Sequence, residues 1–239
     1  DSASLYFNAL NLLQDILKFH LNDAVKDALL DADLERMDFA NTHGVFTNKD
    51  RLYENALSAI EATYPTSPSI AQAMFLRGSL YYRRGQTYDP VENKDVQYEI
   101  KRAKDLYEKA ISKFPGSEGA INAQNMLNQL KMSSLTLQSE KVNIPGQPSR
   151  SLLTYKNADN VYFRILKTNR EQLKKIAQMN YEEGWKAVTD LKPAKSWDIS
   201  LPNLQDYQSH SAEIKIPELE PGTYILLASM NPDFSMIQN

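Results

Sequence analysis

The chain has 239 residues and a net charge of −3, and 42% of its residues are hydrophobic and 24% charged, as in ordinary globular proteins. This length allows one large domain or two modest ones. The acidic balance gives no electrostatic reason to expect binding to nucleic acid or anionic lipid. The absence of cysteine excludes disulfides, Cys-ligated zinc, iron–sulfur clusters and a Cys nucleophile in this sequence.

No apolar run approaches the length of about 18 residues that a membrane span needs. The first residue is Asp1 rather than Met, and no charged-then-apolar leader is present at the start. We therefore expect that a leader has been removed or that the sequence is cut from something longer.

Apolar residues recur at helical spacing from residue 4 to about residue 131. The segments with this spacing are 5–17, 28–40, 52–64, 71–82, 103–114 and 120–130. Pro65 and Pro115 each stop one helix, and Ser67 and Ser117 are expected to cap the helices that follow.

Two residues mark the passage from the second of these helices to the third. Gly44 is expected to supply the left-handed residue beyond the end of the second helix. Asn48 is expected to be the N-cap of the third helix.

The two proline turns belong to an internal repeat. "FPGSEGAINAQNML", which begins at Phe114, echoes "YPTSPSIAQAMF", which begins at Tyr64, and Pro115 follows Pro65 by 115 − 65 = 50 residues. We interpret the repeat as about three helix pairs similar to tetratricopeptide repeats, with a loop at 89–101 that lengthens the spacing. Such a stack is either a packing element without a site of its own or a concave groove that binds peptides.

After Lys131 the pattern changes to short β-rich runs, which predict an antiparallel sandwich. The runs are "SLTLQSEKVNI", "RSLLTYKN", "VYFRIL", "HSAEIKIPEL" and "YILLAS". "NADN" and "EPGT" are turn signals between them. The sequence therefore predicts an α + β protein in two parts: a helical repeat domain over 1–132 and a β-sandwich over 133–239.

The segment over 168–196 has helical spacing and many charges, and we interpret it as a helical insertion between two strands. It contains Trp185 and precedes Trp197. Both tryptophans are expected to cover the edge or the end of the sandwich, and a ligand-binding role is the alternative.

Residues that could carry chemistry were weighed against simpler roles. His20, His43 and His210 are the only histidines, and none has a carboxylate or a second histidine at metal-ligand spacing on one expected face. "YYRRG" at 81–85 mixes aromatic and cationic residues as single-strand binders do, but its arginines also suit the end of a helix.

The acidic residues give no clear site either. Those that precede and occupy the second helix are expected to fall around its cylinder as a solvated face; they are Asp23, Asp27, Asp31, Asp33, Glu35 and Asp38. The loop with Asp89, Asn93 and Asp95 lacks the glycine and the closing glutamate of an EF-hand loop. No catalytic, cofactor-binding or metal-binding residue is assigned.

Several stretches together carry a resemblance to a known family: "DADLERM", the "YP" and "FPGSEGA" turns, "SLTLQSEKVNIPGQP", "TYKNADNVYFRIL", "HSAEIKIPELEPGTYILLAS" and "NPDFS". The chain resembles the amino-terminal part of the large bacterial alpha-2-macroglobulin-like proteins of Bacteroides-like bacteria. The variety in question has a helical region before its first macroglobulin-type domain. The resemblance covers nearly the whole chain, and its most specific part is the order of these stretches.

The resemblance implies TPR-like helical repeats followed by a macroglobulin-type (Ig-like) β-sandwich of seven antiparallel strands. Members of the family entrap proteases: a bait segment is cut, the molecule changes shape and the protease is held. Without cysteine, this sequence cannot contain the Cys–Gln thioester that many members use. We count about six strands, so a last strand is expected to be missing, which would leave an open edge prone to pairing with another chain.

The resemblance therefore implies a non-enzymatic scaffold fragment of a protease-trapping (endopeptidase inhibitor) protein. It also implies export to the periplasm or cell envelope, as a lipoprotein whose lipid anchor lies upstream. The expected partners are proteases, through the intact protein, and neighbouring domains of the same chain; nucleic acid is not expected. No cofactor is expected.

Two other functions stay open. A glycan-binding outer-membrane lipoprotein that pairs with a transporter also carries TPR-like helices, but it would need irregular aromatic-rich loops where this sequence has alternating strands. A stand-alone peptide-binding adaptor would require that residues 1–131 fold and bind a partner by themselves.

Overall fold

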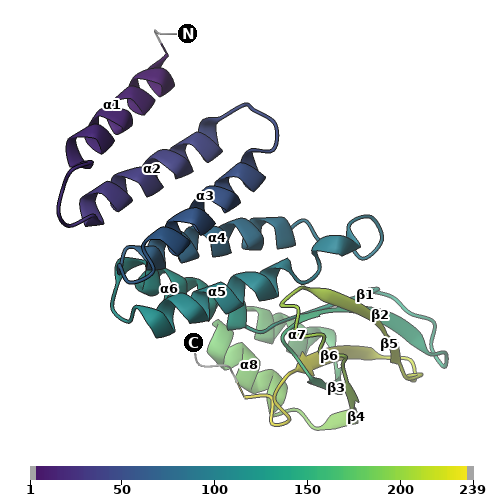
Figure 1. Cartoon of the computed structure of the whole chain (residues 1–239). Helices are drawn as coiled ribbons and strands as arrows, with labels where there is room; N and C mark the ends of the chain where they lie inside the picture. Colours follow the sequence, from purple (N-terminus) through teal and green to yellow (C-terminus); the bar gives the residue numbers. More distant parts are fainter. Residues whose placement is uncertain (1–3, 236–239) are drawn as a thin grey trace. The chain divides into compact units, whose positions relative to one another are not determined.

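Six α-helices in succession are followed by two small antiparallel sheets, as the computed structural model shows for residues 4–235 (Figure 1). The α + β class, with the helices first, is therefore confirmed. The chain forms two units. The helical unit contains the residues up to Lys131 together with Asp206–Gln208, and the β unit contains the remaining residues from Met132 onward.

The helical unit is a run of helices in which each one packs against the next. They are α1 (Leu5–His20), α2 (Asp27–His43), α3 (Lys49–Thr63), α4 (Ile70–Gly85), α5 (Glu99–Lys113) and α6 (Glu118–Lys131), with a 3₁₀ turn, η1 (Lys94–Val96), before α5. Helix α4 also contacts α6, so that it has neighbours on several sides.

The proline turns act as the sequence predicts. Helix α3 ends two residues before Pro65, and α5 ends two residues before Pro115. The Ser117 hydroxyl accepts a hydrogen bond from the Ala120 backbone N–H at 3.3 Å, which confirms it as the cap of α6. Ser67 lies earlier than expected: it begins a tight turn, and α4 starts only at Ile70.

The expectation for Gly44 is wrong. Gly44 is extended, with φ −70° and ψ 143°, rather than left-handed. Glycine is needed there for space, because a Cβ atom would lie 2.4 Å from the Ala40 carbonyl oxygen and from the Phe46 ring. The left-handed residue is Asn48, with φ 59°, which occupies the N-cap position of α3 without a side-chain capping bond.

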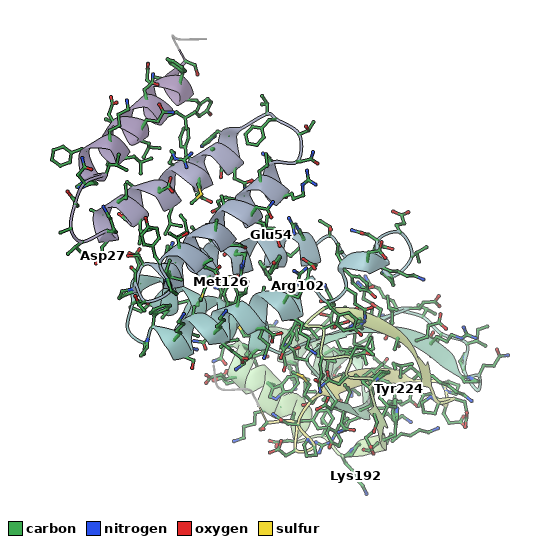
Figure 2. All side chains as sticks on the ribbon, viewed as in Figure 1. Asp27, Glu54, Arg102, Met126, Lys192 and Tyr224 are labelled. Atoms are coloured by element: carbon green, nitrogen blue, oxygen red, sulfur yellow. The ribbon has the colours of Figure 1, made fainter. Side chains whose placement is uncertain are left out.

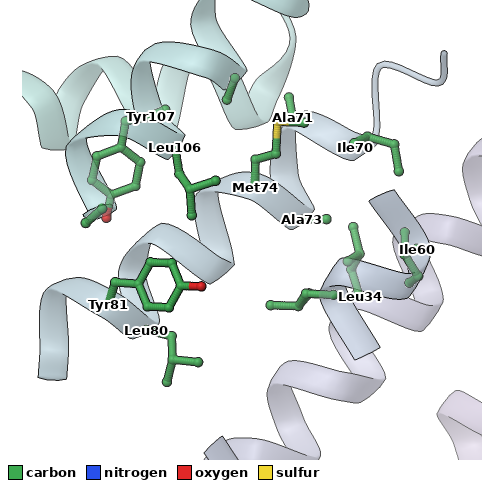
Figure 3. Packing of buried hydrophobic residues seen from close by; sticks show 14 of the residues in the cluster. Leu34, Ile60, Ile70, Ala71, Ala73, Met74, Leu80, Tyr81, Leu106 and Tyr107 are labelled. Atoms are coloured by element: carbon green, nitrogen blue, oxygen red, sulfur yellow. The ribbon is translucent and has the colours of Figure 1, made fainter. Parts of the chain in front are cut away.

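The core of the helical unit gathers around α4 (Figure 3). Tyr107 of α5 is fully buried, and its ring lies where a Cβ atom on Gly78 would come within 2.4 Å. Gly119 of α6 lies directly on the α4 backbone: a Cβ atom there would lie 2.2 Å from the Ala71 carbonyl carbon. Helices α5 and α6 therefore each approach α4 closely at a glycine.

A short segment from late in the sequence completes this unit. The Gln208 side-chain amide is buried and donates to the Gly85 carbonyl at 2.8 Å. The Gln97 side-chain amide donates to Asp206 Oδ2, also at 2.8 Å. These bonds satisfy a backbone carbonyl at the end of α4 and a side-chain amide just before α5.

The β unit consists of two three-stranded antiparallel sheets and two short helices. One sheet has the order β1-β2-β5 and the other β4-β3-β6. Their elements are β1 (Ser134–Ser139), β2 (Ser149–Lys156), β3 (Asn160–Thr168), α7 (Arg170–Ala177), α8 (Tyr181–Thr189), β4 (Pro193–Ser200), β5 (His210–Ile216) and β6 (Thr223–Ser229).

The two sheets share one hydrophobic core. Leu153 of β2 and Phe163 of β3 are almost fully buried in it, together with Ile214 of β5. Phe163 is the register partner of Trp197 in β4, and the two rings stack with centroids 5.0 Å apart. A smaller cluster, which includes Leu227 of β6 and Trp185 of α8, covers the other face of β6.

Two details of the strand prediction are wrong. The helical insertion ends at Thr189, and residues 193–200, which overlap its expected end, form the edge strand β4 with Trp197 inside it. Val142 and Ile144 do not continue β1; they are 84% and 67% exposed in the loop that follows.

Substitution of Gly119 by Ala tests the close approach of α6 to α4. Because the added methyl group would overlap the α4 backbone, we expect the free energy of unfolding of the helical unit to fall by about 3 kcal/mol. Gly184→Ala in α8 is the control, since its Cβ would meet nothing closer than 3.6 Å and alanine favours a helix by about 1 kcal/mol. Urea unfolding of the two variants and of the unchanged chain, followed by circular dichroism, measures these stabilities. An unfolding midpoint of Gly119→Ala equal to that of the unchanged chain would contradict the expectation.

Candidate functional site

The three histidines lie on separate elements and have local partners. His20 Nδ1 and Asp23 Oδ2 are joined by a hydrogen bond of 2.7 Å. The His43 ring lies 4.5 Å from the Phe39 ring, and His210, on β5, lies near the Tyr155 ring at 5.9 Å. Within residues 4–235, no three His, Asp or Glu side chains are grouped to hold a metal ion.

The acidic residues of α2 do not all fall around the helix as expected. Asp31, Glu35 and Asp38 recur at intervals of four and three residues and line one groove, of about 370 Å³, whose other walls come from α4 and α6. Asp38 accepts a hydrogen bond from the Tyr53 hydroxyl at 2.9 Å. Asp33 lies outside this lining and pairs with Arg36.

The loop at Asp89 uses its polar groups to hold itself together. Asp89 Oδ1 accepts hydrogen bonds from the backbone N–H groups of Glu92 (2.8 Å) and Val91 (2.7 Å), and these two bonds lower the pKa of the Asp89 carboxyl. The Asn93 side-chain amide donates to the Thr87 carbonyl oxygen at 2.9 Å. The arrangement is that of a closed turn.

Tyr81 and Arg84, near the end of α4, belong to a partly buried cluster that joins three helices. Glu54 of α3 accepts hydrogen bonds from the Tyr81 hydroxyl (2.6 Å) and from Arg84 Nη1 (2.8 Å) of α4. Arg102 of α5 comes within 4.0 Å of Glu54 Oε1, and its guanidinium carbon lies 4.0 Å from the centre of the Tyr81 ring. Figure 2 labels Glu54 and Arg102.

The charges in this cluster depend on one another. Burial raises the pKa of Glu54, but the hydrogen bonds from Tyr81 and Arg84 outweigh that effect and lower it below its ordinary value. Burial and the bond to Glu54 raise the pKa of Tyr81. The cluster therefore holds an ionised carboxylate between helices, and we assign it a structural role.

An open groove with a volume of about 860 Å³ lies between the two sheets of the β unit. Strand β1 contributes Leu135 and Leu137, and β6 contributes Tyr224 and Leu226, of which Tyr224 is labelled in Figure 2. We call this hollow the inter-sheet groove. Its remaining lining includes Ser139, Ser149, Ser151, Ile165, Trp185, Ile216 and Ala228.

Two loops and one polar pair shape the inter-sheet groove. The loop after β1 is held to the loop after β5 by a hydrogen bond of 2.9 Å from the Gly146 N–H to the Leu219 carbonyl. In the lining, the hydroxyls of Ser139 and Ser151 are 2.6 Å apart and share a hydrogen bond. The groove thus offers apolar side chains, two hydroxyls and the edges of two strands. These groups can bind a ligand through apolar contacts and hydrogen bonds.

Sequence reasoning did not single out this groove, because its residues look like ordinary strand residues. One available signal was the low charge of the two strands that border it: "SLTLQS" and "TYILLAS" contain no charged residue.

Comparison with models of protein families finds no match, and comparison with curated proteins finds no similar sequence. Among the helices of residues 4–235, none combines the length and the apolar character that crossing a membrane requires.

Substitution of Glu54 by Gln tests the cluster between α3, α4 and α5. The pKa of Glu54 is lower in the folded protein than in the unfolded chain, so its contribution to stability is present above the unfolded pKa and is lost as the pH falls through the folded pKa. We expect Glu54→Gln to cost about 1 kcal/mol at pH 7, because the carboxylate is mostly buried, and much less in acid.

Urea unfolding of the unchanged chain and of Glu54→Gln, at neutral and at acidic pH, measures the difference in their free energies of unfolding. Glu92→Gln, in an exposed loop, is the matched control. Its free energy of unfolding should be nearly equal to that of the unchanged chain at both pH values. A cost for Glu54→Gln that stays the same in acid would show that the carboxylate charge is not what matters.

Proposed function

We propose that this chain is a non-enzymatic scaffold module of a protease-trapping protein of the bacterial envelope, similar to the alpha-2-macroglobulin-like proteins. In this proposal the helical unit is a TPR-like repeat and the β unit is a macroglobulin-type sandwich. The chain is exported, is anchored as a lipoprotein through residues upstream, and positions other domains of the same protein.

The observation that carries the proposal is the order of the elements. Six helices precede a two-sheet antiparallel unit, and the connection from β3 to β4 carries the helices α7 and α8. The stretches on which the resemblance rests fall on this framework: "FPGSEGA" is the turn into α6, "NADN" joins β2 to β3, and "YILLAS" lies in β6.

The physical character of the two units supports a role in holding other proteins. The helical unit is held together by close helix contacts at Gly78 and Gly119 and by the partly buried Glu54 cluster. The β unit presents an open groove with binding rather than reactive groups. Rigid elements with accessible surfaces suit a module that positions its neighbours.

The test uses the full-length product of the gene that encodes this chain. We expect incubation with trypsin to give one or a few early cleavages and a complex that retains the protease, detected by native and denaturing gels and by intact mass. A version without residues 1–235 should lose the complex if these residues are needed for trapping. Plain digestion without any retained protease would refute the proposal.

A second candidate is a TPR-containing surface lipoprotein that binds glycans or peptides. The groove of the helical unit favours it, because its walls carry polar groups, among them Asp31, Gln72 and Glu118. Calorimetry of this chain with a panel of oligosaccharides and basic peptides distinguishes the two. Saturable binding that is lost in Gln72→Ala, with no protease retained by the full-length product, would favour this candidate.

A further inference from the structure

The four edge strands of the β unit differ in how they protect their edges. Strand edges carry unpaired backbone N–H and C=O groups, and soluble proteins protect them with charged residues, proline or bulges. Among residues 4–235, β1 and β5 are the edges of one sheet, and β4 and β6 are the edges of the other.

One side of the β unit is protected. Strand β4 starts at Pro193 and carries Lys195 and Asp198, and its pairing with β3 has an irregularity near Ile165. Strand β5 alternates charged and apolar residues, with Glu213 and Lys215 between the apolar positions. In addition, the Lys195 ammonium donates to the Glu218 carbonyl at 2.7 Å, which ties β4 to the end of β5.

The other side carries none of these protections. Strands β1 and β6 contain neither charged residues nor proline, and both border the inter-sheet groove. In β6, "YILLA" is a nearly continuous apolar run, which is the pattern of a strand that is buried on both faces and has neighbours. The shared core covers one face of β6 and the Trp185 cluster covers the other. Within residues 4–235 no strand pairs with the outer edge of β6, although β1 lies close to it.

We propose that the inter-sheet groove binds one extended polypeptide strand, which pairs with the open edge of β6 and inserts alternate uncharged apolar side chains between the two sheets. The unpaired backbone groups of β6 need a partner with its own row of N–H and C=O groups, which an extended peptide has and a lipid or a sugar lacks. The leucines of β1 and β6 favour apolar side chains facing them. A charged peptide side chain facing these leucines would be buried without a partner.

The length and charge of the occupant follow from the same residues. Strand β6 has seven residues, so the occupant pairs over about that length. Charged residues of the groove lie at its rim, in the loops and at the start of α7: Glu140, Lys141, Arg170 and Glu220. An uncharged centre with charged ends therefore complements the groove. This inference is independent of protease trapping.

The test uses the whole chain and a fluorescein-labelled peptide, KTVTVTVTK, whose valines alternate. The control peptide, KTDTDTDTK, places aspartate at the same positions. We expect fluorescence anisotropy to show saturable binding of the valine peptide, at least about tenfold tighter than that of the aspartate peptide. Absence of saturable binding, or equal binding of both peptides, would overturn the proposal.

Two variants locate the binding. Leu137→Lys places a charge in the groove and should weaken binding at least about tenfold. Thr136→Lys is the matched control on the opposite, exposed face of the same strand, and should bind the valine peptide as the unchanged chain does.

Hydrogen exchange gives a readout that does not depend on either variant being folded. Saturation of the unchanged chain with the valine peptide should slow amide exchange in β6 and leave α1 unchanged. Peptide binding with unaltered β6 exchange would place the peptide elsewhere and overturn the proposal. Amide exchange in β6 that is already slow without peptide, together with a concentration-dependent dimer in sedimentation, would make a second copy of this chain the occupant. That result would also overturn the proposal.

Discussion

The helical unit depends on how closely α5 and α6 approach α4. Gly78 accommodates the buried Tyr107 ring, and Gly119 lies against the α4 backbone at Ala71. At these two points any side chain would hold the helices apart, because protein cores have little free volume. The same packing brings three helices near a single carboxylate, that of Glu54, where Tyr81 and Arg84 supply its hydrogen bonds. The pair is partly buried, and the hydrogen bonds around the Glu54 carboxylate compensate for its loss of contact with water.

The helices were predictable wherever local rules decide the outcome. Pro65 and Pro115 end helices because proline cannot continue the hydrogen-bond ladder, and Ser117 caps α6 through its own hydroxyl. Gly44 was misinterpreted because glycine relieves two different constraints, a left-handed backbone and a lack of space, and only the packed Phe46 ring shows which one applies.

The β unit shows where local rules fail. Strand β4 was assigned partly to the helical insertion because "PAKSWDIS" starts with proline and mixes charges with its apolar positions. Its place at a sheet edge explains those charges, but edge positions are known only once the topology is known. Val142 and Ile144 fit the alternation of β1 yet lie in a loop, since alternation does not reveal where a pairing strand ends. Similarly, Asp31, Glu35 and Asp38 become one wall of a groove only after α6 packs beside α4.

The inter-sheet groove was hidden from sequence reasoning for a different reason. A search for chemistry looks for residue types such as histidine, aspartate or cysteine, whereas a sheet edge recognises its partner through backbone groups that every residue has. One trace in the sequence is the absence of charged residues from β1 and β6, and it has meaning only beside the protected edges of β4 and β5. Recognition of this kind selects a pattern of side chains rather than particular residues. Partners of such a site are therefore expected to share alternation and low charge rather than a common sequence.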